Sequence, residues 1–294
     1  MIIMVDERIK KLAKNLVRYS CDLQKGEKIL IEAKGVDYPL INEIIKEVYE
    51  VGGLPFVEIY DNRVTRQLLL GETEELAALR AKYDGARMAE MDAYIGIRGG
   101  NNGNELSDVP EDKLKIESSV YSHPVHSELR VKKTKWVILR YPNEGMAQQA
   151  GMSSDAFENF FFNVCNLDYS KMNKAMDALK ARMDKADRVR VTGKDTDISF
   201  SIKGLGSKKC AGGHNIPDGE VYSAPVKNSV NGVISYNAPS IQNGFKFENV
   251  RLTFKDGKIV EATANDSAKA NAIFDTDEGS RYVGEFAIGV NPFI

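Results

Sequence analysis

Two acidic residues in the second half of the chain, Glu220 and Glu285, have local surroundings that suit a chemical role. Glu220 follows Pro217-Asp218-Gly219, a combination typical of a tight turn, and it begins a run that alternates like a strand. The turn therefore controls the direction in which the carboxylate points. The same pattern is compatible with a solvated glutamate beside a hairpin, which would have no chemical role.

Glu285 is the only acid after Arg281 in a strand-like segment that ends at Val290. Burying a bare carboxylate costs far more free energy than one hydrogen bond returns. A buried Glu285 would therefore need a metal ion, a cation or several hydrogen-bond donors, whereas an exposed one would need none. The neighbouring Gly284 and Gly289 leave room for a ligand to approach the backbone.

The histidines give weaker signals for metal binding than the two glutamates. His123 and His126 are three residues apart with a proline between them, a spacing that also suits a helix start or a loop. His214 lies six residues before Glu220 and could turn toward the same place. The histidines are therefore alternative ligands and not the basis of a site.

Motifs of other enzyme classes are absent or incomplete. The sequence contains no HExxH zinc motif, no GxSxG nucleophile elbow and no Walker loop. The glycine-rich loop between Arg98 and Asn104 follows a predicted strand and could bind an anion through its backbone amides, but it lacks the GxGxxG spacing and also reads as a flexible loop. No two cysteines form a CxxC pair, which argues against a zinc knuckle or a disulfide framework and favours buried thiols at Cys21, Cys165 and Cys210.

The elements that must position these residues differ between the two halves of the chain. In the first half, strand and helix patterns alternate, which predicts an α/β domain with an open, mostly parallel sheet and helices on both faces. The predicted strands are Lys28–Lys34, Pro55–Tyr60, Asp92–Arg98 and Lys135–Tyr141, and the predicted helices include Asp6–Gln24, Tyr38–Val51 and Glu111–Lys132.

A long helical region from Ser154 to Ala186, broken near Asp168, is predicted to bridge two domains. Beyond it the pattern changes to short alternating runs separated by Gly, Asp and Asn turns, with a helix near Ala268–Phe274 and a last strand over Tyr282–Val290. We therefore predict an α/β domain over residues 1–186 and a β-rich α+β domain over residues 187–294.

Composition limits the partners of the chain. It has 294 residues, of which 43% are hydrophobic and 28% charged, the profile of a globular protein large enough for two domains. Forty Lys and Arg residues against 42 Asp and Glu residues give a net charge of -2, so no global basic field attracts nucleic acid or anionic lipid. With no signal-peptide or membrane-span pattern, we predict a cytoplasmic protein without nucleic-acid or membrane partners.

Several motifs, spread over essentially the whole chain, resemble the thermophilic aminopeptidase family, whose members are metal-dependent leucyl-type aminopeptidases. Two of these motifs contain the glutamates named above. The matching segments are 141–153, 157–162, 196–198, the run Asn-Ile-Pro-Asp-Gly-Glu-Val-Tyr-Ser-Ala-Pro at 215–225, and Asp-Glu-Gly-Ser-Arg-Tyr-Val-Gly-Glu at 277–285.

This resemblance implies an enzyme that releases N-terminal amino acids from peptides through two divalent metal ions, which are zinc, cobalt or manganese. It implies that the ions lie in the β-rich domain, that Glu220 and Glu285 are metal ligands in the catalytic centre, and that a homodimer partner helps to enclose the cavity. A glutamate at such a site can instead act as the general base, and the resemblance leaves that division of roles open.

The sequence departs from the family pattern after the second glutamate motif. Family members continue with two histidines, a tyrosine and an aspartate that complete the metal shell, whereas this chain ends at Ile294. We therefore expect the second domain to be incomplete and this 294-residue form to have little or no peptidase activity. The alternative is a catalytically inactive chain that serves at most as a peptide-binding or dimerising module.

Overall fold

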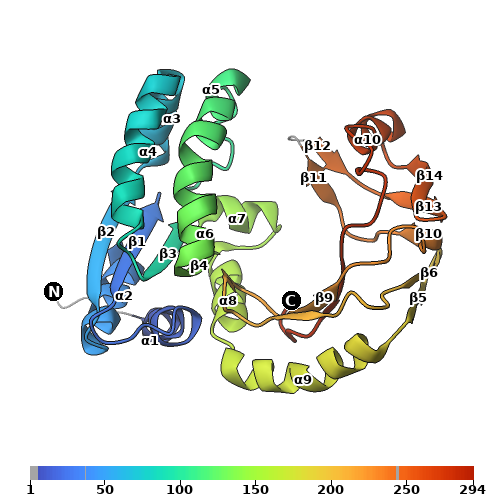
Figure 1. The fold of residues 1–294 in the computed structure, drawn as a ribbon, viewed down its shortest axis with the longest axis horizontal. Coiled ribbons are helices and arrows are strands. Elements are labelled where there is room, and N and C mark those ends of the chain that lie inside the picture. Colours follow the sequence, from blue (N-terminus) through green and yellow to red (C-terminus); the bar gives the residue numbers. More distant parts are fainter. Residues whose placement is uncertain (1–5, 37, 243–244) are drawn as a thin grey trace. The chain divides into compact units, whose positions relative to one another are not determined.

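Five strands form one parallel sheet, in the order β2-β1-β3-β4-β8, in the computed structural model of the chain (Figure 1). The inner strands β1 (Lys28–Lys34) and β3 (Ala93–Arg98) are buried along nearly their whole length, as expected for strands covered on both faces. Beside them, β2 (Leu54–Tyr60) forms one edge, and β4 (Lys135–Arg140) pairs with the two-residue β8 (Asn215–Ile216). The predicted α/β fold is confirmed.

Helices connect these strands, and side-chain caps define where several of them begin. Asp61, Thr73 and Ser153 each accept a hydrogen bond from a backbone N–H in the first turn of the following helix. The predicted break near Asp168 is confirmed, because one helix ends at Cys165 and the next begins at Tyr169. The helices are α1 (Glu7–Lys14) with its π-helical continuation η1 (Asn15–Ser20), α2 (Tyr38–Glu50), α3 (Asn62–Leu70), α4 (Glu74–Met88), α5 (Glu111–Ile116) with π-helical η2 (Glu117–Arg130) and α6 (Val131–Lys133), α7 (Glu144–Gln149), α8 (Ser154–Cys165) and α9 (Tyr169–Lys185).

The structure describes residues 6–36, 38–242 and 245–294, and the chain divides into two compact units. The first unit holds the chain up to Lys171, together with Cys210–Asp218 and Asn291–Ile294. The second holds Met172–Lys209 and Gly219–Val290. The domain boundary at residue 186 stays a prediction. Within the described ranges, no helix is both long enough and apolar enough to span a bilayer.

The second unit is built mainly from antiparallel strands, as the alternating runs predict. One sheet has the order β14-β13-β10-β6-β5, a smaller one has the order β15-β9-β7, and β11 pairs with β12. A helix, α10 (Ser267–Phe274), follows the strand β14. The strands are β5 (Arg188–Gly193), β6 (Thr196–Ser201), β7 (Lys208–Cys210), β9 (Glu220–Ser223), β10 (Asn231–Ser235), β11 (Ser240–Gln242), β12 (Phe245–Phe247), β13 (Arg251–Lys255), β14 (Lys258–Thr263) and β15 (Phe286–Gly289).

The last strand is shorter than the sequence predicts. Continuous pairing covers only β15, whereas the prediction begins at Tyr282. Tyr282 instead forms a single bridge with Lys258, so the chain leaves one strand partner before it joins another. Glu285 lies in the unpaired stretch between these two partners.

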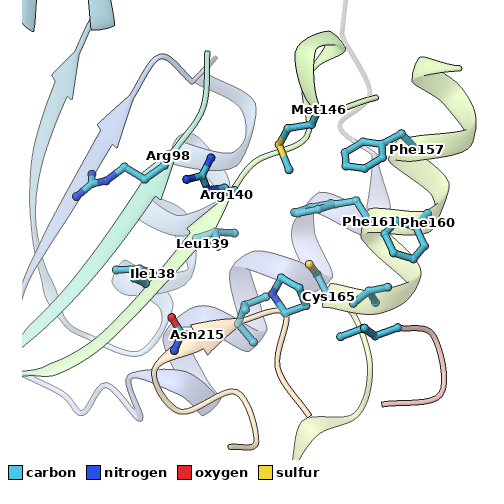
Figure 2. Close-up of a pocket in the computed structure, with 14 residues that line it drawn as sticks. Arg98, Ile138, Leu139, Arg140, Met146, Phe157, Phe160, Phe161, Cys165 and Asn215 are labelled. Atoms are coloured by element: carbon cyan, nitrogen blue, oxygen red, sulfur yellow. The ribbon is translucent and has the colours of Figure 1, made fainter. Parts of the chain in front are cut away.

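The four long strands of the parallel sheet end in register. Tyr60, Lys34, Arg98 and Arg140 occupy paired positions on β2, β1, β3 and β4, and paired residues of parallel strands project to the same face. A cavity of about 520 Å³ lies beside the two arginines, and α8 forms its opposite side (Figure 2). The carboxyl ends of parallel strands are a common location for ligand sites.

Candidate metal site

Glu220 is the first residue of β9, directly after the turn that the sequence predicts. Gly219 in this turn has a φ of +137°, a backbone conformation that favours glycine. The preceding Asp218 is held within the first unit: its Oδ2 accepts a hydrogen bond from the Gly212 N–H at 2.7 Å, and its carbonyl accepts one from Asn291 Nδ2 at 2.9 Å. The half-buried Glu220 side chain therefore follows a backbone that is constrained on its amino-terminal side.

Glu285 lies at the surface, immediately before β15. Of the two environments compatible with the sequence, buried or exposed, the structure gives the exposed one. A solvent-facing carboxylate needs no internal partner to offset desolvation. Glu285 is therefore accessible to a cation from solution.

The pairing of β9 with β15 brings the segments that contain the two glutamates side by side. Glu220 pairs with Gly289, and Glu285 is four residues before that glycine. Glu285 itself lies one residue before β15, outside the continuous pairing, so strand alternation does not fix the direction of its side chain.

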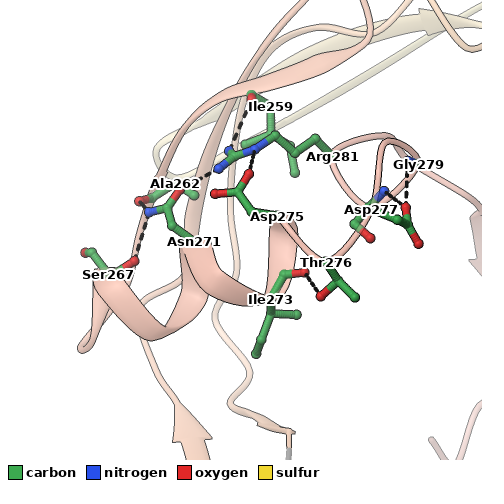
Figure 3. A network of polar contacts seen from close by, with 11 residues as sticks. Ile259, Ala262, Ser267, Asn271, Ile273, Asp275, Thr276, Asp277, Gly279 and Arg281 are labelled. Carbon is green, nitrogen blue, oxygen red and sulfur yellow. Dashed lines mark hydrogen bonds and ion pairs between the residues drawn. The ribbon is translucent and has the colours of Figure 1, made fainter.

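A polar network fixes the segment that leads to Glu285 (Figure 3). The Arg281 guanidinium donates to Asp275 Oδ1 at 2.6 Å, to Asn271 Oδ1 at 3.1 Å and to the Ile259 carbonyl at 3.4 Å. The hydrogen bond from Arg281 lowers the pKa of Asp275 below its usual value. Arg281 therefore joins the end of α10 to β14 and to the chain that precedes β15.

A second anchor lies just before Arg281. Asp277 Oδ1 accepts hydrogen bonds from the backbone N–H groups of Gly279 at 2.6 Å and Ser280 at 2.8 Å. Hydrogen bonds from Ser280, followed by that from the Gly279 amide, lower the pKa of Asp277. These contacts give a structural role to the residues of the second glutamate motif that are not themselves ligand candidates.

The three histidines have neighbours other than Glu220 and Glu285. His214, in the first unit, stacks on Trp136 with ring centroids 4.5 Å apart, and its Nδ1 lies 3.3 Å from the Trp136 carbonyl oxygen. Burial lowers the pKa of His126 to about 4, which keeps this ring neutral near pH 7. His123 is exposed beside Glu128. In residues 6–36, 38–242 and 245–294, no three His, Cys, Asp or Glu side chains form a group able to hold a metal ion.

The two glutamates fit part of a divalent-metal shell. Carboxylate oxygens bind zinc and manganese, and the backbone near both glutamates is open, because a Cβ built on Gly284 or Gly289 meets no atom within 4 Å. Three protein ligands are usual for a catalytic zinc ion. The part of the chain that the structure describes thus offers two ligands of such a shell.

Known proteins share this fold and sequence over nearly the whole chain. Aminopeptidase PepS of Streptococcus thermophilus is 24% identical over an alignment of 319 positions, gaps included. This alignment covers 96% of this chain and 76% of that protein. The structure of wild-type AmpT from Thermus thermophilus matches with a TM-score of 0.78 at 21% identity, over 96% of this chain and 78% of the other.

A dioxygenase also shares the fold. The structure of 2,5-dihydroxypyridine dioxygenase from Pseudomonas putida matches with a TM-score of 0.54 at 10% identity, over 97% of this chain and 77% of the other. Because one fold hosts different chemistries, this likeness concerns architecture alone. The sequence decides the family: the model of the thermophilic metalloproteases matches residues 5–292, and the chain belongs to that family.

Proposed function

We propose that this chain is a metal-dependent aminopeptidase that releases N-terminal amino acids from peptides, with Glu220 and Glu285 as ligands of two divalent ions. Membership of a metalloprotease family and the aminopeptidase names of its relatives support the reaction class. The observation that supports the site is the β9–β15 pairing, which brings the segments that contain the two glutamates side by side next to open backbone.

The residues of this chain supply charge and access in such a reaction. The carboxylates of Glu220 and Glu285 attract divalent cations and the ammonium group of a peptide's first residue. The bare backbone at Gly284 and Gly289 leaves room for an extended substrate next to the glutamates. Bound zinc, cobalt or manganese ions would polarise the scissile carbonyl and lower the pKa of a bound water.

We further propose that the 294 residues alone bind metal weakly and have low activity. The support is that two carboxylates are fewer than the three protein ligands usual for catalytic zinc, and no third ligand joins them within the described ranges. The same observation favours the second candidate function, a catalytically inactive chain that binds peptides or dimerises.

A second copy of the chain is the partner we propose besides the peptide substrate. β2 is an edge of the parallel sheet as far as the structure describes it, and its exposed side chains are apolar: Leu54, Phe56, Val57 and Ile59. An exposed apolar edge strand offers unpaired backbone groups to another strand and is normally covered.

Metal content and peptidase activity together test these proposals. We expect purified chain to bind divalent metal with an affinity that depends on both glutamates, and to hydrolyse aminoacyl-anilides when zinc, cobalt or manganese is added in excess. Metal binding without turnover would support the inactive binding module. If the chain neither binds metal nor hydrolyses the anilides, the active-enzyme proposal is contradicted.

A further inference from the structure

Three basic residues, Lys34, Arg98 and Arg140, lie in a row at the carboxyl edge of the parallel sheet. Their positive charge exceeds the negative charge of Glu32, the acid that two of them contact. Arg98 donates to Glu32 Oε1 at 2.8 Å and to the Tyr94 hydroxyl at 3.4 Å, and Lys34 Nζ lies 3.5 Å from the same Glu32, which is only 4% exposed. Within the described ranges, the guanidinium of Arg140 has no hydrogen-bond or ion-pair partner. Arg98 and Lys34 thus share one buried carboxylate while Arg140 beside Arg98 has none in the described part of the chain, and an added anion would relieve the repulsion between these cations.

The cavity beside Arg98 and Arg140 has an aromatic wall. Figure 2 shows Phe157, Phe160 and Phe161 of α8 on the side opposite the two arginines. Phe160 is 40% exposed, although an aromatic ring of this size is normally covered. A cavity of about 520 Å³ with a mainly apolar lining and a few polar groups has the size and character of a small-molecule site.

A second, polar cavity of about 380 Å³ shares Arg98, Arg140 and Met146 with the aromatic one. Its lining includes the loop from Gly99 to Gly103 and the side chains of Asn143 and Gln149. Arg98 and Arg140 therefore lie where the apolar cavity meets the second cavity, whose lining is rich in Asn and Gln residues.

The loop at this second cavity is closely packed. Gly100 has a φ of +102°, and a Cβ on it would lie 2.3 Å from Asn62 Nδ2, which donates to the Gly99 carbonyl at 3.0 Å. Only glycine fits this approach. The carboxylate that lines the cavity, Glu105, receives a hydrogen bond from Asn102 Nδ2 at 2.9 Å.

We propose that the two cavities form one site for an α-carboxylate that carries an aromatic or branched aliphatic side chain. The carboxylate lies between Arg98 and Arg140, the apolar side chain enters the cavity lined by α8, and the amino side of the residue enters the polar cavity. The ligand is a free hydrophobic amino acid or the C-terminal residue of a peptide. This site goes beyond the proposed aminopeptidase activity, because that activity acts at the amino end of a peptide.

Isothermal titration calorimetry with N-acetyl-L-phenylalanine tests the site. This probe lacks a free α-amine and so cannot be a substrate for an aminopeptidase. We expect saturable one-site binding, and binding at least about tenfold weaker for the uncharged N-acetyl-L-phenylalanine amide, because a charge-assisted hydrogen bond to arginine is lost. Free phenylalanine distinguishes the two candidate ligands. If it binds more tightly than N-acetyl-L-phenylalanine, the ligand is a free amino acid. If the acetylated form binds more tightly, the ligand is the C-terminal residue of a peptide.

Two variants and a matched control locate the binding. Arg140→Gln should weaken N-acetyl-L-phenylalanine at least about tenfold, and Phe160→Ala should weaken it by removing the exposed ring. Arg188→Gln, at an exposed arginine of β5 in the second unit, should leave the affinity unchanged. Arg140 and Phe160 are both exposed, so we expect the melting temperatures of these variants to match that of the parent chain.

Three results would overturn this inference: no saturable binding up to about 10 mM probe, equal affinity for the acid and its amide, or unchanged affinity in Arg140→Gln. The Glu220→Gln, Glu285→Gln double variant separates it from the proposed function. Its affinity for N-acetyl-L-phenylalanine should equal that of the parent chain, with or without a chelator. Loss of binding in that variant would assign the ligand to the metal site instead.

Discussion

Glu220 and Gly289 lie directly opposite each other across the antiparallel strands β9 and β15. Opposite residues in such a pair have Cβ positions about 5 Å apart on the same face. Gly289 has no side chain, and a Cβ built on it meets no atom within 4 Å. The space beside the Glu220 carboxylate is therefore kept open by the absence of a side chain on the neighbouring strand.

Substitution of Gly289 should separate stability from function. Gly289→Val fills the open space without a clash at Cβ and introduces a residue favoured in strands, so the melting temperature should change by no more than about 2 °C. Metal affinity and aminoacyl-anilide hydrolysis should fall at least about tenfold, because the isopropyl group occupies the approach to Glu220. Gly193→Val, at the end of β5, is the matched control. Unchanged activity in Gly289→Val would mean that this space is not used.

Each glutamate should be required for metal binding. Glu220→Gln and Glu285→Gln replace a charged ligand with a neutral one, and each should lower metal affinity at least about tenfold, because hard cations prefer carboxylate oxygens. Titration of zinc and manganese followed by mass spectrometry measures the occupancy. Glu278→Gln changes an acid of the same motif and should bind metal like the parent chain. A glutamine variant with normal occupancy but no turnover would identify that glutamate as the general base.

Arg281 should contribute more to stability than its ion-pair partner. Its side chain is 17% exposed and donates to three groups, two at the end of α10 and one on β14, whereas Asp275 is 60% exposed. Arg281→Lys keeps the charge but removes the planar guanidinium, which donates to three groups at once. The free energy of unfolding should therefore fall by about 1–2 kcal/mol. Asp275→Asn should cost less than about 0.5 kcal/mol, because exposed ion pairs contribute little. Urea unfolding of both variants tests this order, and a reversed order would contradict it.

Strands buried on both faces were predictable from the sequence. β1 matches its predicted bounds, Lys28–Lys34, because a short apolar run that only Glu32 interrupts, bounded by lysines and followed by a glycine, is typical of a buried strand. The last strand was predicted too long, because its start depends on tertiary contacts. The Arg281 side chain and the bridge from Tyr282 to Lys258 determine where pairing with β9 begins, and neither leaves a local pattern.

The charged row at the sheet edge could not be found from local sequence for a similar reason. Arg98 and Arg140 are 42 residues apart, and only the register of β3 with β4 makes them neighbours. The glutamates Glu220 and Glu285 could be proposed from the sequence because each lies in a recognisable turn or glycine motif, and their role stays a prediction. The pairing of β9 with β15, which brings their segments side by side, depends on tertiary contacts and was not predictable.

Acid should destabilise the first unit through His126. Burial lowers the pKa of this histidine to about 4, and the nearby charges are Glu32, which opposes the shift, and Arg130, Lys34 and Arg98, which add to it. The folded state thus binds fewer protons than the unfolded state, whose histidine pKa is about 6.5. The resulting stability is present above pH 6.5 and is lost as the pH falls toward 4, by about 1–2 kcal/mol between pH 7 and pH 5.

Urea unfolding at several pH values measures this dependence. His126→Gln cannot be protonated in this range, so its stability should change less than that of the parent chain between pH 7 and pH 5. His123→Gln, at an exposed histidine, should behave like the parent chain. The same pH slope in His126→Gln would assign the acid sensitivity to other groups.

The exposed edge of β2 should govern self-association. Ile59 is 64% exposed on this strand, and its replacement by lysine adds a charge where a second copy would bury an apolar side chain. Sedimentation velocity should show a dimer for the parent chain and a shift toward monomer for Ile59→Lys, with at least about a tenfold weaker dimer. Ile241→Lys is the matched control, because Ile241 is also 64% exposed but belongs to β11 in the second unit. A dimer that survives Ile59→Lys and dissociates in Ile241→Lys would place the interface on the second unit.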